Sequence, residues 1–158
     1  ERMVKLAIAD TPYFLYSDFE LRRKGNTYTA QTLSLLREEY REDVFYFIIG
    51  ADSLYQIEQW FHPELVMKLA VLLVAGRAYH DDHQPFDRQI EYLTARYGAK
   101  IYPIRCREMD VSSEEIRASV SDGHSIHGFV PDAVEEYIKD HGLYGGGVKT
   151  PVLAGKGE

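Results

Sequence analysis

The sequence predicts an α/β fold in which helices cover both faces of a parallel sheet. Residues 45–49 and 70–75 are unbroken apolar runs, and residues 99–105 form a third strand-like segment. Segments with helical spacing separate the three, and this alternation is typical of parallel sheets. Unbroken apolar runs indicate strands that are buried on both faces. A chain of 158 residues is long enough for one domain with a sizeable core.

Local patterns predict the remaining elements in order. The first ten residues have helical spacing and no capping residue ahead of them, so we expect the body of a helix that starts further upstream. Residues 13–23 alternate loosely and are rich in aromatic side chains, which predicts a strand or extended segment before a turn at 24–26. Helical spacing predicts helices over 29–40, 63–69, 84–98, 112–121 and 131–141.

Proline and glycine sharpen three of these predictions. Pro103 indicates that the third strand lies at an edge or contains a bulge. Pro131 lies in the first turn of the last helix and Gly142 follows its end, as is usual for helix boundaries. We expect one domain over residues 1–144 and a flexible, glycine-rich tail or linker over 145–158.

Composition excludes several classes of protein. The net charge of −7 and the pI near 5.4 argue against a general nucleic-acid or membrane-surface binder. The single cysteine, Cys106, rules out an intrachain disulfide, and we expect it at a core or strand-end position. Without an apolar run of membrane-spanning length, we expect a cytoplasmic protein. The sequence leaves open whether the chain is a homo-oligomer.

The stretch FYFIIGADSL, residues 45–54, places polar chemistry at the end of a buried strand. In open α/β sheets, ligands bind beyond the carboxyl ends of the strands. Gly50 would let a ligand approach the backbone closely, and the Asp52 carboxylate would accept two sugar hydroxyls. An N-cap role for Asp52 on the following short helix explains the same residue equally well. The pattern therefore favours both roles.

A second candidate lies in VSSEEIRASV, residues 111–120. Ser112 and Ser113 open a predicted helix whose N-terminus suits phosphate oxygens, and Arg117 would add a charged contact. A plain N-cap with a surface arginine is the simpler interpretation. Glu114 and Glu115 favour it, because their carboxylates compete with an anion for the same donors.

Aromatic and histidine residues are less specific. Trp60 is more typical of a core residue than of a stacking plate for a flat ring, and His62 has no metal partner at helical spacing. The HDDH stretch at 80–83 indicates an exposed loop rather than a metal site. His124 and His127 lie in a turn, where solvent exposure is the expectation and contact with an anionic substrate the alternative. We predict no metal held by this chain.

Four motifs together carry a resemblance. They are KGNTYTAQTL (24–33), FYFIIGADSLYQIEQWF (45–61), VSSEEIR (111–117) and VPDAVEEYIKDHGLY (130–144). In this order and spacing the chain resembles bacterial nicotinate-nucleotide adenylyltransferases over residues 1–144. The resemblance implies a Rossmann-like nucleotidyltransferase fold and transfer of AMP from ATP to nicotinate mononucleotide. The products would be deamido-NAD and pyrophosphate, with Mg²⁺ bound with ATP.

The resemblance also implies roles for particular residues. Gly50 and Asp52 would hold the adenosine ribose. Trp60 would stack on the pyridine ring, with Thr29 and the Phe61 backbone near the nicotinate carboxylate. The contacts to the ATP phosphates would come from Ser112, Ser113 and Arg117. Direct in-line attack requires no protein nucleophile, so catalysis would rest on positioning and charge stabilisation.

The chain departs from this family in three places. It contains no His-x-Gly-His motif, so the first β-α unit is missing and we expect this chain alone to be inactive or nearly so. Glu114 stands where the family usually has threonine, and His127-Gly128 stands where Arg-Tyr is common. Two alternatives therefore stay open: a related nucleotidyltransferase with another acceptor, such as phosphopantetheine, and a non-catalytic nucleotide-binding module.

Overall fold

The computed structural model describes residues 1–75, 86–105 and 111–145. The HDDH stretch at 80–83, Cys106 and the glycine-rich tail from residue 146 lie outside these residues. The chain divides into two compact units. We call Phe19–Glu108 the sheet unit, and Glu1–Asp18 with Met109–Glu158 the helical unit. Among the described residues, the helices are all too short or too polar to cross a membrane.

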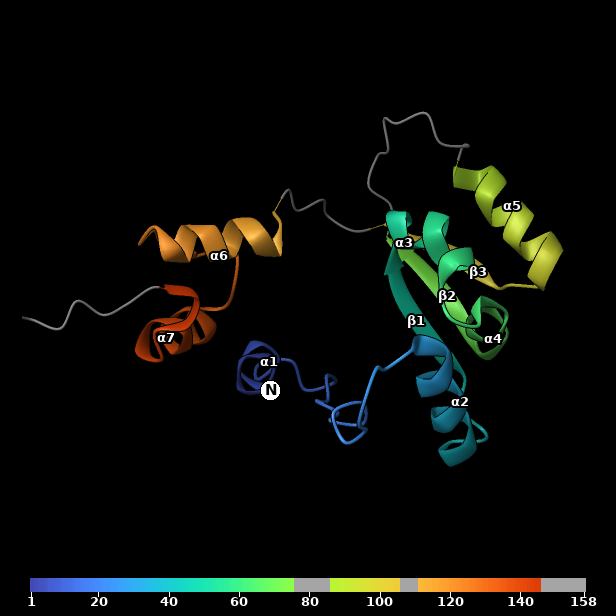
Figure 1. Cartoon of the computed structure of the whole chain (residues 1–158), viewed down its shortest axis with the longest axis horizontal. Coiled ribbons are helices and arrows are strands. Elements are labelled where there is room, and N and C mark those ends of the chain that lie inside the picture. Colours follow the sequence, from blue (N-terminus) through green and yellow to red (C-terminus); the bar gives the residue numbers. More distant parts are fainter. Residues whose placement is uncertain (76–85, 106–110, 146–158) are drawn as a thin grey trace, which may run out of the picture. The chain divides into compact units, whose positions relative to one another are not determined.

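The sheet unit is built on three parallel strands in the order β1-β2-β3 (Figure 1). These are β1 (Phe45–Gly50), β2 (Ala70–Ala75) and β3 (Ile101–Ile104). The apolar run of β2 forms the central strand, which pairs on both sides: Leu72 lies opposite Phe47 of β1 and Ile101 of β3. Pro103 lies in an edge strand of this sheet, as predicted, because an edge position has a free side where no N–H is needed.

The helices of the sheet unit are α2 (Thr29–Glu39), α3 (Ala51–Gln56), α4 (Pro63–Leu69) and α5 (Phe86–Tyr97), with a 3₁₀ turn, η1 (Ile57–Gln59). They close a core whose innermost side chains have no solvent exposure. Those side chains are Leu54, Ile57, Val66, Leu72, Val74 and Leu93. The predicted helices at 29–40, 63–69 and 84–98 are thus confirmed within one or two residues over the described ranges.

Strand β1 has two unlike faces. Phe45 and Phe47 pack against the core and Ile49 is buried, whereas Tyr46 and Ile48 are 62% and 64% exposed. The prediction that this strand is buried on both faces is wrong for the Tyr46 and Ile48 face. An unbroken apolar run does not reveal which alternate side chains face the core.

Residues 13–23 were predicted as a strand or an extended segment, and the strand alternative is wrong. This segment is irregular and includes turns at its beginning and end. It pairs with none of the three strands; instead its polar side chains bond to α2. Arg23 Nη2 donates to Thr32 Oγ1 at 2.8 Å, and that hydroxyl donates to Glu20 Oε1 at 2.5 Å. The bend that follows contains Gly25 with φ of 88°, which fits the predicted turn.

The helical unit contains α1 (Arg2–Ala7), α6 (Ser113–Ser121), α7 (Asp132–Asp140) and the 3₁₀ turn η2 (Leu143–Gly145). Its buried apolar side chains are Val120, Ile126, Val134 and Ile138. Helix α7 ends at Asp140 with His141 as its C-cap, and Gly142 follows with φ of 58°, so glycine supplies the left-handed residue predicted just past this end. Helix α1 is shorter than predicted, at six residues.

Candidate functional site

The carboxyl end of β1 leads directly into α3. Gly50 is the last residue of the strand and also the N-cap of the helix, with φ of −78° and ψ of 161°. A side chain tolerates this backbone conformation, and a Cβ at this position would meet no described heavy atom within 4 Å. Backbone strain and packing against the described residues therefore do not explain the glycine. Open space beside its Cα is what a close ligand approach requires.

Asp52 is exposed and lies in the first turn of α3. The prediction that Asp52 is the N-cap is wrong, because Gly50 holds that position and the end has no side-chain cap. A carboxylate in the first turn is still favoured by the helix dipole. With capping removed as an explanation, this exposed carboxylate two residues beyond the strand end has no hydrogen-bond partner among the described residues and has the chemistry to accept hydroxyl groups.

Trp60 and Phe61 follow the 3₁₀ turn in different environments. Trp60 is partly buried against the core, where its ring meets Phe47 edge-on with centroids 6.2 Å apart. The Phe61 ring is 42% exposed and stacks on Tyr28, with centroids 4.4 Å apart and planes 29° apart. The core and stacking interpretations of Trp60 are compatible, because one part of a half-buried indole packs inward while another stays accessible.

The Tyr28–Phe61 stack brings two predicted substrate contacts together. Tyr28 is the N-cap of α2, so the half-buried Thr29 is the first residue of that helix. Stacking on Phe61 therefore holds the start of α2 beside the Trp60-Phe61 segment. Thr29, Trp60 and Phe61 lie in one region of the sheet unit although about thirty residues separate them in the sequence.

His62 fixes the direction of the chain after Phe61. Its φ of 50° and ψ of 59° are left-handed, a conformation that costs a non-glycine residue roughly 1–3 kcal/mol. Its ring meets Phe61 edge-on at 4.2 Å, and its Nδ1 lies 2.9 Å from Glu64 Oε1. This contact lowers the pKa of the Glu64 carboxyl below its ordinary range. Pro63 then begins α4, which suits the first helical position.

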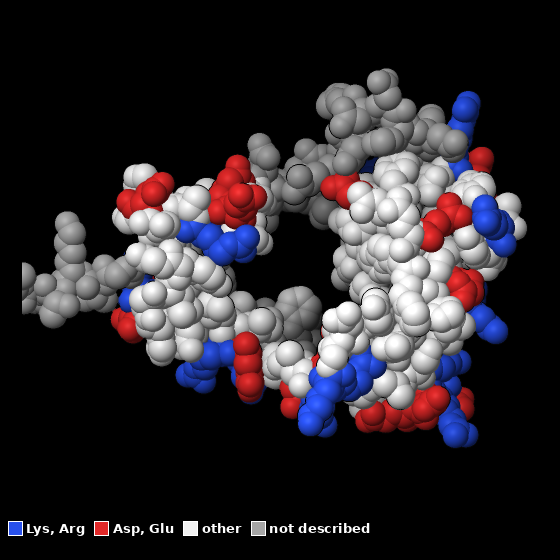
Figure 2. Space-filling model, in the orientation of Figure 1, with Lys and Arg blue, Asp and Glu red and all other residues white. Residues whose placement is uncertain are grey.

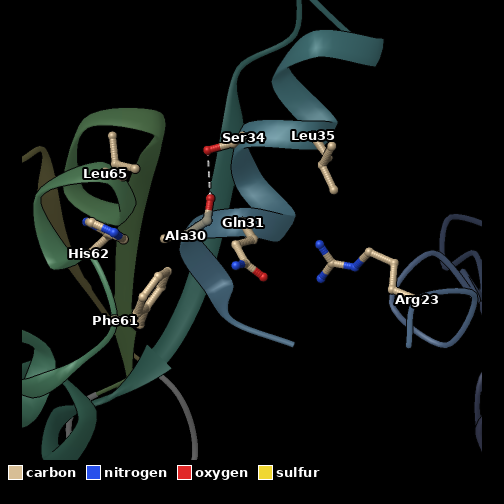
Figure 3. Close-up of a pocket in the computed structure, with 8 residues that line it drawn as sticks. All are labelled: Arg23, Ala30, Gln31, Ser34, Leu35, Phe61, His62 and Leu65. Atoms are coloured by element: carbon tan, nitrogen blue, oxygen red, sulfur yellow. Dashed lines mark hydrogen bonds between the residues drawn. The ribbon is translucent and has the colours of Figure 1, made fainter. Parts of the chain in front are cut away.

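A pocket of about 300 Å³ lies beside Phe61 and His62 (Figure 3). Leu65 of α4 lines it together with Phe61 and His62, which directly precede that helix. Arg23 lines it from the irregular segment before α2. Helix α2 contributes residues at helical spacing along one face: Ala30, Gln31, Ser34 and Leu35. Ser34 Oγ donates to the Ala30 carbonyl at 2.8 Å, so that hydroxyl can still accept a hydrogen bond from a ligand but has no proton left to donate.

Of these lining residues, sequence reasoning identified only Phe61 as a site residue. The recurrence of residues 30, 31, 34 and 35 on one face of α2 was the available signal. That signal does not show which face of α2 stays uncovered, because the packing of α4 against α2 decides which face is covered.

In the helical unit, the start of α6 forms a capping box. Ser112 Oγ accepts the Glu115 N–H at 3.1 Å, and Glu115 Oε2 accepts the Ser112 N–H at 2.7 Å. These contacts lower the pKa of the Glu115 carboxyl. The predicted competition thus takes place, since Glu115 occupies one donor. The Ser112 hydroxyl proton, the Ser113 hydroxyl and the exposed Arg117 side chain keep donors that an anion would accept.

Charge is mixed on the face of the molecule seen in Figure 2. Around the sheet unit in that view, Lys and Arg side chains are interspersed with Asp and Glu. Such a distribution resembles that of an ordinary protein surface rather than the continuous basic stripe of a nucleic-acid binder.

The fold is that of a nucleotidyltransferase. Two solved structures of Plasmodium falciparum nicotinic acid mononucleotide adenylyltransferase match 90% of this chain, one complexed with NaAD and one with APC. The first has a TM-score of 0.68 and 19% sequence identity, with 71% of that chain covered. The second has a TM-score of 0.67 and 20% identity, with 73% covered. No family model matches the chain.

Sequence relatives define the family more narrowly. A probable nicotinate-nucleotide adenylyltransferase of Lachnoclostridium phytofermentans is 47% identical over 142 residues, which cover 90% of this chain and 70% of the relative. The protein of the same description from Caldicellulosiruptor bescii is 39% identical with the same coverage. The chain belongs to the nicotinate-nucleotide adenylyltransferase family. The resemblance inferred from the four sequence motifs is thereby confirmed, and so is the Rossmann-like fold.

Proposed function

We propose that this chain is built for adenylyl transfer from ATP to nicotinate mononucleotide, the reaction that yields deamido-NAD and pyrophosphate in NAD biosynthesis. The 47% identity to a relative of that description carries the proposal. The structural neighbours complexed with NaAD and APC support nucleotide substrates. A cytoplasmic location fits the single cysteine and the use of ATP.

The pyridine end of the substrate is assigned to the sheet unit. Trp60 would stack on the nicotinate ring through its exposed part, while its contact with Phe47 keeps the indole from turning. Thr29 and the Phe61 backbone would bind the nicotinate carboxylate. The Tyr28–Phe61 stack supports this assignment, because it fixes the start of α2 against the Phe61 backbone. Backbone N–H groups at a helix start are good donors to a carboxylate.

The adenosine and phosphate contacts follow the same logic. Gly50 and Asp52 would hold the ribose: the open space at Gly50 admits it, and the Asp52 carboxylate accepts its hydroxyls. The hydroxyls of Ser112 and Ser113 and the guanidinium of Arg117 would donate to the ATP phosphates. Because donors of this kind suit phosphate oxygens rather than a cation, Mg²⁺ would bind through ATP and water. Once bound, the ion would neutralise phosphate charge.

The reaction requires no covalent intermediate with the protein. A phosphate oxygen of nicotinate mononucleotide attacks the α-phosphorus of ATP, and the bond from that phosphorus to the bridging oxygen of pyrophosphate breaks in line. The residues named above would bind the pyridine, ribose and phosphate groups of the two substrates. The 158 residues contain no His-x-Gly-His motif. We therefore expect turnover by this chain alone to be slower than turnover by a family member that contains the motif, by a factor on the order of 10² or more.

Calorimetric titration of the chain with nicotinate mononucleotide and, separately, with ATP tests the proposal. We expect both nucleotides to bind. Trp60→Ala should weaken binding of nicotinate mononucleotide by roughly tenfold, given about 1–3 kcal/mol for ring stacking, and should change ATP binding much less. Trp60→Phe, which keeps a ring, should retain most of the affinity.

Tyr102→Ala serves as the matched control, because it removes an aromatic ring that is 56% exposed on β3 and belongs to no proposed contact. Equal binding of the amide mononucleotide, or binding of phosphopantetheine in its place, would contradict the acceptor named here. A chain that binds nucleotides but shows no transfer when combined with its family's His-x-Gly-His unit would be a non-catalytic module.

A further inference from the structure

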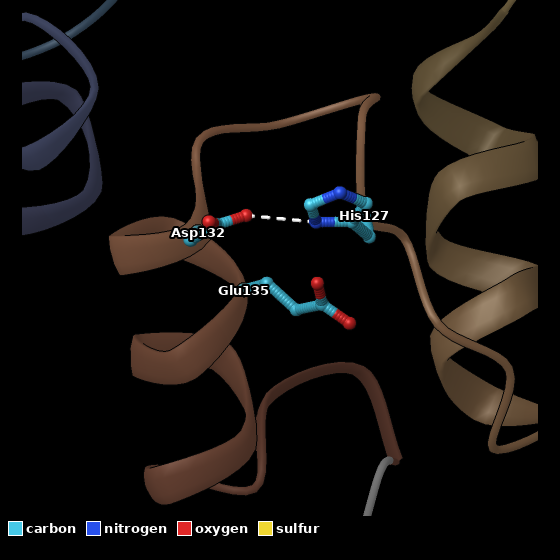
Figure 4. Close-up of side chains that lie close together, drawn as sticks. All are labelled: His127, Asp132 and Glu135. Carbon is cyan, nitrogen blue, oxygen red and sulfur yellow. Dashed lines mark hydrogen bonds and ion pairs between the residues drawn. The ribbon is translucent and has the colours of Figure 1, made fainter.

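A second group of chemically reactive side chains lies in the helical unit. His127 comes from the turn after α6, and Asp132 and Glu135 come from the first turn of α7 (Figure 4). One potential ligand atom from each residue lies within 4.8 Å of the other two. Asp132 and Glu135 are three positions apart and so share one face of the helix. The adenylyl transfer proposed above uses none of these three residues.

Glu135 is the fixed member of the group. Its side chain is only 8% exposed. Its Oε1 accepts the Ser125 hydroxyl at 2.8 Å and the Ile126 N–H at 3.2 Å, and it pairs with Lys139 Nζ at 2.7 Å. Lys139 above all, then Ser125, lowers the pKa of the Glu135 carboxyl, so the group is ionised at neutral pH.

The second oxygen of Glu135 distinguishes this group from an ordinary buried ion pair. All three of these donors approach Oε1, and Oε2 accepts no hydrogen bond from the described residues. The carboxylate extends from α7 toward the loop that carries His127 (Figure 4). A carboxylate more than nine-tenths buried is thus held rigidly by one oxygen while the other retains its acceptor capacity.

His127 and Asp132 are the exposed members. Their side chains are 76% and 74% exposed, and His127 Nδ1 lies 2.9 Å from Asp132 Oδ1. Ligand atoms about 2.1 Å from a tetrahedral metal ion lie roughly 3.4 Å apart. The three ligand atoms already lie within 4.8 Å of one another, and the two exposed side chains have room to rotate toward this spacing around Glu135.

We propose that His127, Asp132 and Glu135 form a binding site for a divalent transition-metal ion of the Zn²⁺ type. One imidazole and two carboxylates suit such an ion, whereas Mg²⁺ prefers oxygen ligands alone. The bound ion would link the turn that carries His127 to α7 and so stabilise the helical unit. Lys139 opposes it electrostatically, because its ammonium group lies beside the same carboxylate.

The test is a Zn²⁺ titration of the 158-residue chain in competition with a chromophoric chelator. The background carries His80→Ala, His83→Ala and Cys106→Ser, so that these other potential ligands do not contribute. We expect one Zn²⁺ per chain. His127→Ala and Asp132→Asn should each weaken Zn²⁺ binding by about tenfold or more, since even the loss of a residue that only supports a metal ligand lowers metal affinity by roughly 10–100-fold. Neither variant endangers folding, because both side chains are exposed.

Two further variants separate this site from nonspecific binding. Lys139→Gln should tighten Zn²⁺ binding several-fold, because it removes a competing cation and leaves the three ligands intact. His124→Ala, an exposed histidine three residues before His127, should leave the affinity unchanged. The proposal is overturned if His127→Ala binds Zn²⁺ like the parent, or if Lys139→Gln does not tighten binding. Adenylyl transfer can fail or succeed without affecting either result.

Discussion

The two units of this chain are stabilised in different ways. In the sheet unit, fourteen buried residues from three strands and their helices form one continuous apolar core. In the described part of the helical unit, the corresponding core contains four buried residues. The helical unit adds specific polar contacts: the Ser112–Glu115 capping box and the bonds of Glu135 to Ser125, Ile126 and Lys139.

This difference shows how a small unit compensates for a small core. Apolar burial is proportional to area, so a unit with little buried area gains less from it. Polar contacts fill part of the gap, but they depend on ionisation in a way that apolar contacts do not. The sheet unit has ionic contacts of its own, such as His62–Glu64, but a much larger core. A change of pH should therefore matter more for the helical unit, and a cavity in the core more for the sheet unit.

The largest effect should follow from a cavity in the sheet unit. Leu72 has no exposure and lies in the central strand, so Leu72→Ala should destabilise this unit by about 2–5 kcal/mol. Amide hydrogen exchange in β1, β2 and β3 would measure the loss. Leu35→Ala, at a side chain 38% exposed, should cost much less and serves as the control. Equal loss of protection in α7 would show that the units unfold together, and the comparison would then be wrong.

Acid should act first on the helical unit. The pKa values of Glu115 and Glu135 are lowered from their ordinary value of 4.5 by the serine and lysine contacts of the folded state. A lowered folded pKa gives stability that is present above about pH 4.5 and is lost as the pH falls toward the folded value. The protection factors of amides in α6 and α7, corrected for the intrinsic pH dependence of exchange, should therefore fall below pH 4.5 before those in β2 do.

Glu135→Gln tests the source of that acid response. The amide keeps the size of the side chain but cannot ionise, so the variant should be less stable at neutral pH and less sensitive to acid than the parent. A titration of both proteins, followed by amide exchange from pH 7 to pH 3, measures this. An unchanged acid response in the variant would mean that Glu135 does not anchor this unit.

The smallest of these effects concerns the start of α6. Ser112→Ala removes the N-cap and should cost about 1 kcal/mol, within the usual range of 0.5–2 kcal/mol. Protection of the first amides of α6 would measure the loss. Ser113→Ala is the matched control, because Ser113 is the first helical residue and not the cap. If the two variants behave alike, the capping box does not stabilise the unit.

Local patterns predicted most elements of the fold. The strands at 45–49 and 70–75 and the helices at 29–40, 63–69 and 131–141 depend on periodicity and on Pro and Gly at their ends, and both are properties of neighbouring residues. The errors have separate causes. The alternation at residues 13–23 had no strand to pair with, and Asp52 lost the N-cap position because α3 begins two residues earlier than an Asp52 cap would place it.

The sequence by itself determined the family, since the motifs at 24–33, 45–61, 111–117 and 130–144 need only order and spacing to be recognised. Only the tertiary structure decided which side chains meet. Phe61 stacks on Tyr28 from thirty-three positions away, and Glu135 binds the turn that carries His127. Such contacts depend on how helices pack and on which of their faces remain open. Packing is a property of the whole unit, and no local pattern encodes it.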